Sequence, residues 1–333
     1  MLDEVFAGLS LTVLGPGIKV ICFWCWLRFG VAASSAAWGW LGPGSDAGLP
    51  SPKPAVLTLP PFVVVFTMQG LKIAIGGKGG VGKTTVCAVW AQLFAQDGFD
   101  VLAIDADPNA NLALAFGIPI EQCPKPLIQM KELIAERTGT SRDAPAAYFR
   151  LNPNVSDIPQ KYWLKVDGVK LLVLGAITRA GAGCACPEGA FLKALLTHTI
   201  LQRQELVLVD LAAGVESMGR ASVQGIDALI VVVEPGGRSI ETANNAAKMA
   251  RDLGIKHVAA IANKITEAAQ TDVIRSQLKD IPLLGSLGYS RSVQQVDIER
   301  KPATEADAEF VQGLRQAKNA LVDLISPGLK KRR

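Results

Sequence analysis

Charged residues, histidine and cysteine are all scarce in this 333-residue chain. Charged residues make up 19% of the sequence and hydrophobic residues 49%, a balance that excludes a disordered chain. The formal net charge of +4 is too small for a chain of this size to argue for nucleic-acid binding. Six cysteines do not make a disulfide framework here. Two histidines leave little room for a histidine-rich metal site, so metal binding would depend on thiolates.

The first 67 residues differ in composition from the rest. They hold three Lys or Arg and three Asp or Glu, with four of the six Trp and seven of the nineteen Pro. The apolar stretch from Phe6 to Trp26 is broken by Gly15-Pro16-Gly17, which makes it a poor membrane-spanning helix. We interpret residues 1–67 as an extension translated from upstream of the true start at Met68, with an anchor or targeting segment as the alternative. We expect residues 68–333 to form one domain.

From Met68 onward, predicted strands alternate with predicted helices. Short apolar runs predict strands over Leu71–Gly76, Val101–Asp105, Val169–Leu174, Leu206–Asp210, Ala228–Val233 and His257–Ala262. Helical spacing predicts helices over Lys83–Gln96, Pro187–Gln202, Ser239–Leu253 and Glu305–Ile325. This alternation predicts an α/β fold, a doubly wound and mostly parallel sheet flanked by helices that binds ligands at the carboxyl ends of its strands. We interpret the Pro-punctuated stretch Glu121–Leu164 as an insertion with short helices.

The segment between the first strand and the first helix matches G-x-x-x-x-G-K-[ST], the phosphate-binding P-loop pattern. Its glycines let backbone N–H groups curl around phosphate oxygens, and the helix that follows adds the partial positive charge of its N-terminus. We expect Lys83 to reach the β- and γ-phosphates of ATP and Thr84 to bind Mg²⁺. The predicted nucleotide-binding residues here are Gly77, Lys78, Gly79, Gly80, Val81, Gly82, Lys83, Thr84 and Thr85.

A second lysine near the start of the loop, Lys78, makes the segment resemble the deviant Walker A ATPases, the family that includes MinD, ParA and the nitrogenase iron protein. The resemblance extends from Met68 to about Ile325. It implies an ATPase that forms a nucleotide-sandwich homodimer. In that dimer Lys78 would reach across to the partner's phosphates and stabilise charge there.

Carboxylates at the ends of two predicted strands extend the resemblance. Asp105 and Asp107 look like the family's switch I, and such a pair would be repelled by a polyphosphate unless Mg²⁺ lay between them. By resemblance Asp107 positions the attacking water and Asp105 lies nearer Mg²⁺. Asp210, followed by Gly214, fits the Walker B strand and switch II, and would hold a Mg²⁺-bound water. Asn263 matches the asparagine with which the family reads adenine.

A Cys-x-Cys pair, Cys184 and Cys186, lies just before the helix predicted from Pro187. Thiols at i and i+2 can face one side of an extended segment, and thiolates are soft donors suited to Zn²⁺, Ni²⁺ and Cu⁺. Two thiolates are half of a four-coordinate site, and a symmetric dimer would supply the other half. With the Walker B strand, this segment resembles the CooC family, nickel-handling ATPases that mature carbon monoxide dehydrogenase. The resemblance implies a Ni²⁺ or Zn²⁺ site at these cysteines and a client metalloenzyme.

Switch II departs from the pattern of that family. The family has D-M-E-A-G-x-E-H where this chain has Asp210-Leu211-Ala212-Ala213-Gly214-Val215-Glu216-Ser217. Ala212 and Ser217 therefore stand where an acidic residue and a histidine are expected. These departures bear on the client enzyme and the metal, and they leave nucleotide binding untouched.

Three other functions compete with nickel delivery. A MinD-like membrane ATPase would need a basic amphipathic C-terminal helix, but acidic residues dilute that face and favour docking on the core. A ParA-like DNA-segregating ATPase would need a basic stripe. An iron–sulfur ATPase like the nitrogenase iron protein would need Cys186 as its second cluster ligand. We expect a cytoplasmic ATPase with no nucleic-acid partner, and no membrane contact unless residues 1–67 provide one.

Overall fold

A computed structural model describes residues 70–140, 149–175, 186–202, 205–212, 214, 223 and 225–325. The chain divides into two units, Met1–Gln69 and Gly70–Arg333, and every described residue belongs to the second. The extension predicted for residues 1–67 lies outside the described residues, as does Cys184.

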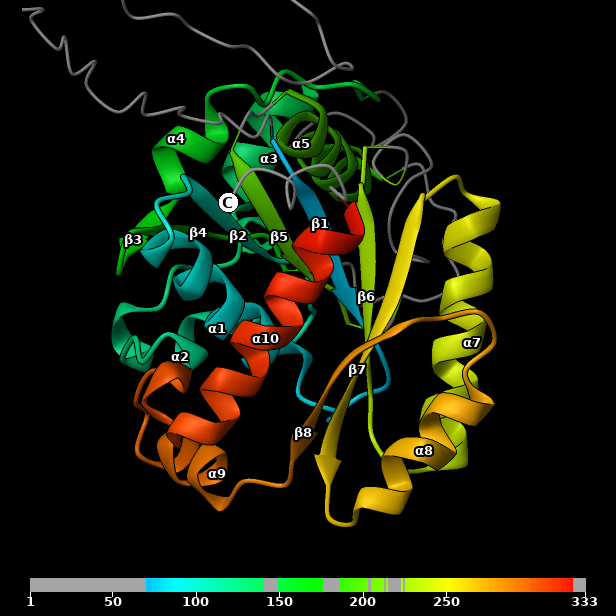
Figure 1. Cartoon of the computed structure of the whole chain (residues 1–333). Coiled ribbons are helices and arrows are strands. Elements are labelled where there is room, and N and C mark those ends of the chain that lie inside the picture. Colours follow the sequence, from blue (N-terminus) through cyan, green and yellow to red (C-terminus); the bar gives the residue numbers. More distant parts are fainter. Residues whose placement is uncertain are drawn as a thin grey trace, which may run out of the picture. The chain divides into compact units, whose positions relative to one another are not determined.

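An eight-stranded sheet forms the centre of the described unit (Figure 1). Its strands are β1 (Lys72–Gly76), β2 (Val101–Asp105), β3 (Leu164–Val166), β4 (Val169–Val173), β5 (Leu206–Asp210), β6 (Ala228–Val233), β7 (His257–Ile265) and β8 (Leu283–Gly288). Their spatial order is β3-β4-β2-β5-β1-β6-β7-β8. Every neighbouring pair is parallel except β3 with β4. The predicted mostly parallel α/β fold is confirmed.

Helices cover both faces of the sheet. They are α1 (Lys83–Gln96), α2 (Leu112–Ala115), α3 (Lys131–Thr138), α4 (Ile158–Tyr162), α5 (Pro187–Gln202), α7 (Gly237–Asp252), α8 (Ala268–Gln277), α9 (Arg291–Ile298) and α10 (Ala308–Ile325). Helices α1 and α10 lie against each other on one face (Figure 1). Residues of α3, α5, α7 and α8 share one core cluster on the other face.

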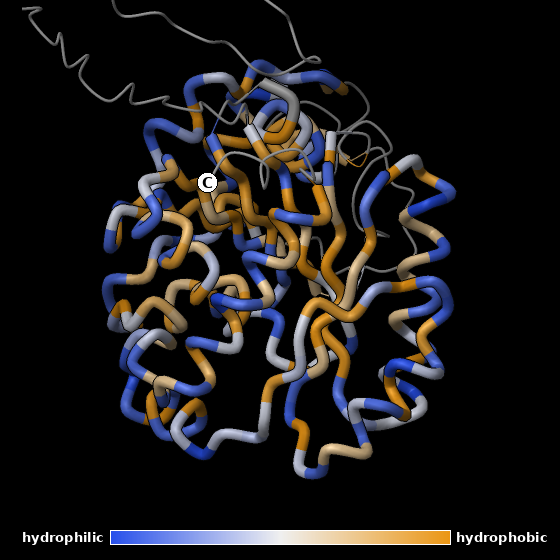
Figure 2. The backbone as a smooth tube through the Cα atoms, in the orientation of Figure 1, coloured by the Kyte–Doolittle hydropathy of each residue, from blue (hydrophilic) through white to orange (hydrophobic). Residues whose placement is uncertain are grey.

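The central strands are buried on both faces. Each residue of β1, β2, β5 and β6 is buried, which is why these strands read as continuous apolar runs and do not alternate with polar residues. Figure 2 shows the same pattern, with hydrophobic residues along the inner strands. Because the strands are parallel, their carboxyl ends meet at one edge, where the polar residues of the site emerge.

The last helix packs on the core, as its sequence predicts. Phe310, Leu314 and Leu321 of α10 are buried, and the indole N–H of Trp90 on α1 donates to the carbonyl oxygen of Leu314 at 3.0 Å. No helix in the described part of the chain combines the length and the apolar character needed to span a bilayer.

Five of the described α-helices and strands were missing from the sequence prediction: α2, β3, α8, β8 and α9. The β8 sequence LLGSLG carries two glycines and a serine, so it lacks the β-branched content of a recognisable strand. Gly285 is suited to its place because a Cβ there would lie 3.2 Å from the Ala317 Cβ of α10. Two boundaries moved by three residues each. Strand β7 continues through Asn263 to Ile265, and α10 begins at Ala308, because Asp307 accepts a hydrogen bond from the Phe310 N–H and caps the helix.

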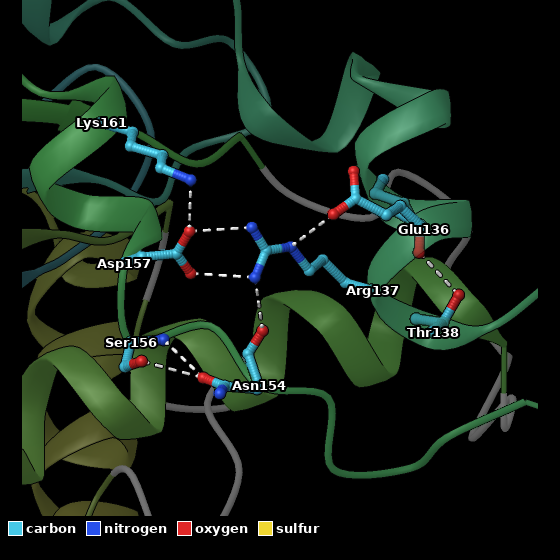
Figure 3. Close-up of polar contacts among 8 residues, drawn as sticks. Glu136, Arg137, Thr138, Asn154, Ser156, Asp157 and Lys161 are labelled. Atoms are coloured by element: carbon cyan, nitrogen blue, oxygen red, sulfur yellow. Dashed lines mark hydrogen bonds and ion pairs between the residues drawn. The ribbon is translucent and has the colours of Figure 1, made fainter.

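The insertion Glu121–Leu164 contains short helices, as predicted, and an ion-pair cluster joins two of them (Figure 3). Arg137 on α3 donates to both carboxylate oxygens of Asp157, at 2.9 and 2.8 Å. Lys161 of α4 also lies 2.7 Å from this carboxylate. Hydrogen bonds from Arg137 and Lys161 hold the pKa of Asp157 well below its usual range. The bidentate pair therefore fixes the end of α3 against the start of α4.

Candidate functional site

The P-loop connects β1 to α1 at the carboxyl edge of the sheet, and two of its glycines are required by close contacts. A Cβ on Gly77 would lie 2.4 Å from the Val232 carbonyl oxygen of β6, and one on Gly82 would lie 2.5 Å from the Asn263 amide nitrogen. Both glycines also have positive φ angles, 138° and 99°, which L side chains rarely adopt. The P-loop backbone therefore packs closely against β6 and against the Asn263 side chain of β7.

Lys83 is buried at the base of the loop. Its side chain belongs to a residue only 6% exposed, and its ammonium donates to the Lys78 carbonyl oxygen at 3.2 Å. Burial lowers the pKa of Lys83, while the charges of Asp210 and Asp107 act in the opposite direction. Lys83 is the one P-loop lysine that the described structure buries. The charges of Asp210 and Asp107 favour its protonated form. A bound polyphosphate would add more negative charge beside it.

Asp210 and Thr84 form an oxygen-rich pair beside Lys83. The Thr84 hydroxyl donates to Asp210 Oδ2 at 2.7 Å, while Asp210 Oδ1 is buried and has no hydrogen-bond partner. Burial raises the pKa of Asp210 to about 7, against the opposing hydrogen bond from Thr84. A buried carboxylate oxygen without a donor is costly unless a cation or a cation-bound water satisfies it. A hydroxyl and a carboxylate are also donors that Mg²⁺ prefers, so these residues fit Mg²⁺.

Asp105 lies beside Asp210 in the sheet, because the two residues are register partners on β2 and β5. Both oxygens of Asp105 accept backbone hydrogen bonds, one from the Asp107 N–H at 3.1 Å and one from the Leu112 N–H at 2.9 Å. Burial raises its pKa to about 6 although these hydrogen bonds oppose the shift. Asp105 therefore fixes the backbone of the loop after β2. Of these two carboxylates, Asp210 is the one with an oxygen that accepts no hydrogen bond.

Asp107 and Asn263 take positions on either side of the P-loop region. Asp107 is half-buried, and its Oδ1 accepts from the Asn109 N–H at 2.8 Å, which closes a tight turn after β2. Asn263 is 6% exposed, and its amide N–H donates to the Val81 carbonyl oxygen at 2.8 Å. The asparagine that the sequence assigns to adenine thus holds the P-loop to β7 in this structure.

Two charged residues at this site were not singled out from the sequence. Glu234 follows β6, and Lys264 follows Asn263 within β7. The Lys78 ammonium lies 3.0 Å from Glu234 Oε1, the Lys264 ammonium lies 3.5 Å from Oε2, and Lys264 also donates to the Gly80 carbonyl oxygen at 2.6 Å. Their place at the carboxyl ends of neighbouring parallel strands is the signal that could have found them.

The described half of the Cys-x-Cys segment lies at the start of α5. Cys186 is partly exposed, and its sulfur accepts a hydrogen bond from the Gly189 N–H of α5 at 3.3 Å. Cys184 lies outside the described residues, as does Ser217 of switch II, whereas Ala212 is described and partly buried. Within the described ranges, no group of three or more His, Cys, Asp or Glu is placed to hold a metal ion. Cys87 is fully buried in the core of the unit.

Comparison with known proteins connects this site to a family. Residues 72–303 match the CobQ/CobB/MinD/ParA nucleotide binding domain. The carbon monoxide dehydrogenase accessory protein CooC of Rhodospirillum rubrum is 43% identical over 229 residues, which cover 68% of this chain and 87% of that protein. An uncharacterized ATP-binding protein of Methanocaldococcus jannaschii is 40% identical over 235 residues, 70% of this chain and 90% of that protein.

Solved structures agree on the fold. The septum site-determining protein MinD of Pyrococcus horikoshii, complexed with Mg-ADP, is similar with a TM-score of 0.56 at 19% identity, over 79% of this chain and all of that one. MinD of Aquifex aeolicus gives a TM-score of 0.54 at 19% identity, over 76% of this chain and 97% of that one. The matched domain, the close-fitting P-loop and the Thr84–Asp210 pair lead to one conclusion: this chain belongs to the CobQ/CobB/MinD/ParA nucleotide-binding family and is a P-loop ATPase.

Proposed function

We propose that this ATPase is a maturation factor that delivers nickel to a metalloenzyme such as carbon monoxide dehydrogenase, acting as an ATP-dependent homodimer. The observation that carries the proposal is the 43% identity to CooC over 87% of that protein's length. The Cys184-x-Cys186 pair before α5 supports a thiolate metal site.

ATP hydrolysis rests on four residues of the described site. Lys83 binds the β- and γ-phosphates as a buried cation, and the P-loop N–H groups bind the remaining phosphate oxygens. Thr84 and Asp210 hold Mg²⁺, which supplies positive charge to the phosphates when it is bound. Asp107 orients the water whose oxygen attacks the γ-phosphorus. The bond from the γ-phosphorus to the bridging oxygen then breaks, and ADP leaves with that oxygen.

The homodimer completes the site with Lys78. Its side chain is 42% exposed, so the ammonium can reach a second copy of the chain. In the dimer each Lys78 contacts the nucleotide of the partner subunit and stabilises the charge that develops on the phosphates during hydrolysis. Association and ATP binding therefore strengthen each other.

The nickel cargo binds at the two-fold axis through Cys184 and Cys186 of both subunits. Four thiolates around one divalent ion carry a net charge of −2, which the N-terminus of α5 partly offsets. The Gly189 N–H that donates to the Cys186 sulfur supports this placement of negative charge at the helix start. Because the thiols must lose their protons, metal binding should release protons and weaken below neutral pH.

The test is metal stoichiometry on the full chain. Purified protein with ATP is titrated with Ni²⁺ or Zn²⁺, and bound metal and molecular mass are measured together. We expect one ion per dimer, and its loss in a Cys184→Ser/Cys186→Ser double variant. Cys123→Ser is the matched control: Cys123 lies in the insertion, where its thiol donates to the Ile118 carbonyl oxygen, and its loss should not affect metal binding.

Four results would count against nickel delivery. One ion per monomer, or full binding by the double variant, would remove Cys184 and Cys186 from the metal site. A broad visible absorbance with iron and sulfide after anaerobic purification would favour an iron–sulfur ATPase. ATP-dependent binding to lipid vesicles by a metal-free protein would favour a MinD-like function.

A further inference from the structure

One carboxylate at the P-loop is shared by two lysines, one in the loop itself and one on β7. Glu234 Oε1 lies 3.0 Å from the Lys78 ammonium and Oε2 lies 3.5 Å from the Lys264 ammonium. The side chain of Glu234 is 23% exposed and each lysine side chain is 42% exposed. The three groups therefore form a partly buried network in which each oxygen of the carboxylate faces its own cation.

Glu234 is held in place by contacts that do not involve Lys78. Its own backbone N–H donates to the Ser239 hydroxyl at 3.1 Å, at the start of α7. On the other side, Lys264 donates to the Gly80 carbonyl oxygen at 2.6 Å and has a left-handed backbone with φ 60°. Lys264 thus ties Glu234 to the P-loop whether or not Lys78 is in place.

This contact conflicts with a role for Lys78 in a partner subunit. An ammonium that donates to Glu234 of its own chain cannot at the same time contact phosphate across a dimer interface. Dimer formation must break the Lys78–Glu234 pair, whereas the Lys264–Glu234 pair can remain. The carboxylate then keeps one cation, which limits the unfavourable energy of releasing Lys78.

We propose that Glu234 is a positioning residue for Lys78. In the free subunit the Glu234 carboxylate holds the Lys78 ammonium within its own chain. When two copies associate, a phosphate of the partner's nucleotide replaces this carboxylate as the contact of Lys78. This inference rests on the proposed ATP-dependent homodimer. Removal of the carboxylate should therefore favour association. Nucleotide binding by a single subunit should change little, because in the proposed dimer the Lys78 ammonium contacts the nucleotide of the partner subunit.

Burial of Glu234 by itself would raise its pKa, but the hydrogen bond from Lys78 and the charges of both lysines lower the pKa below its usual range. The carboxylate is therefore ionised at neutral pH, and Glu234→Gln removes a charge while it keeps the shape of the side chain. Glu299→Gln is the matched control. Glu299 forms a 2.7 Å pair with Lys301 after α9, with side chains 37% and 51% exposed.

Two measurements test the proposal on the full chain. The first is competitive acetylation of lysines in nucleotide-free protein, read by mass spectrometry. Glu234→Gln removes the carboxylate that lies 3.0 Å from the Lys78 ammonium, so the amine is freed for the reagent and should react at least about twofold faster. Glu299→Gln should leave the rate at Lys78 unchanged and raise it at Lys301.

The second measurement is the dimerisation constant with a non-hydrolysable ATP analogue, by analytical ultracentrifugation. A partly exposed ion pair changes an equilibrium by up to about fivefold, and two pairs break per dimer, so Glu234→Gln should dimerise up to about 25-fold more tightly. The monomer's affinity for ADP should stay within about twofold. Equal or weaker dimerisation, or an unchanged acetylation rate at Lys78, would overturn the proposal.

The outcomes also separate this proposal from the proposed function. If the wild-type chain never dimerises with the analogue, the homodimer itself is wrong and the exchange of partners falls with it. If the wild-type chain dimerises and Glu234→Gln behaves like wild type in both measurements, the homodimer stands and Glu234 has no role in positioning Lys78.

Discussion

The substitution Asp210→Asn tests whether the oxygen without a donor exists for a cation. In nucleotide-free protein without Mg²⁺, the ionised Asp210 is buried with one oxygen that accepts no hydrogen bond. Its pKa is about 7 in the folded chain and 3.8 ordinarily. The native state therefore binds more protons than the unfolded state between these values. The free energy of unfolding should fall as pH rises from about 4 to about 7 and stay low above that.

The size of the effect follows from the same two values. A rise in pKa from 3.8 to about 7 corresponds to an ionisation penalty of about 4 kcal/mol at pH 8. Asparagine has no such penalty, but it leaves a buried N–H group without an acceptor, which costs about 2 kcal/mol. The net gain at pH 8 is about 2 kcal/mol, which raises the melting temperature of a unit of this size by about 5 °C. At pH 5 the carboxyl is already protonated, so the gain should disappear or reverse.

Thermal unfolding in the presence of a chelator, at pH 5 and pH 8, measures this difference. Addition of Mg-ADP at pH 8 should stabilise the wild-type chain, because a ligand that binds the folded state raises its stability. It should have little effect on Asp210→Asn, which lacks the carboxylate proposed to hold Mg²⁺. Asp227→Asn is the control, since Asp227 accepts from the Lys72 N–H away from the P-loop and should keep the response to Mg-ADP. The reasoning fails if Asp210→Asn shifts the melting temperature equally at both pH values.

Three further substitutions test the other groups of the site. Lys83→Ala should abolish tight ATP binding because the buried cation at the phosphates is lost, and micromolar affinity by calorimetry would contradict the P-loop assignment. Lys78→Ala should bind ATP with near-normal affinity but lose dimerisation and hydrolysis, so turnover at the wild-type rate in a phosphate-release assay would exclude the role across the dimer. Asp107→Ala should bind ATP, hydrolyse it at least about a hundredfold more slowly and accumulate as an ATP-bound dimer. Unchanged turnover would remove Asp107 from the mechanism.

Local patterns located the P-loop and most of the central sheet in advance. The continuous apolar runs of β1, β2, β5 and β6 gave correct strands because these strands are buried on both faces. The prediction was wrong at β8, where LLGSLG has weak strand propensity and pairing with β7 decides the conformation. It was also three residues early at the start of α10, where the Asp307 cap sets the boundary.

For the site, the sequence by itself determined which residues carry the chemistry, and the tertiary structure decided how they are paired. A P-loop is a contiguous motif, so Lys83 and Thr84 could be read from the chain directly. The Thr84–Asp210 hydrogen bond, the backbone partners that occupy both oxygens of Asp105, and the Asn263 contact with Val81 join residues from different elements. The Lys78–Glu234–Lys264 network could not be predicted from local sequence patterns for the same reason. Lys78 lies 156 residues before Glu234 in the sequence, and only the parallel order β1-β6-β7 brings the ends of these strands to one edge.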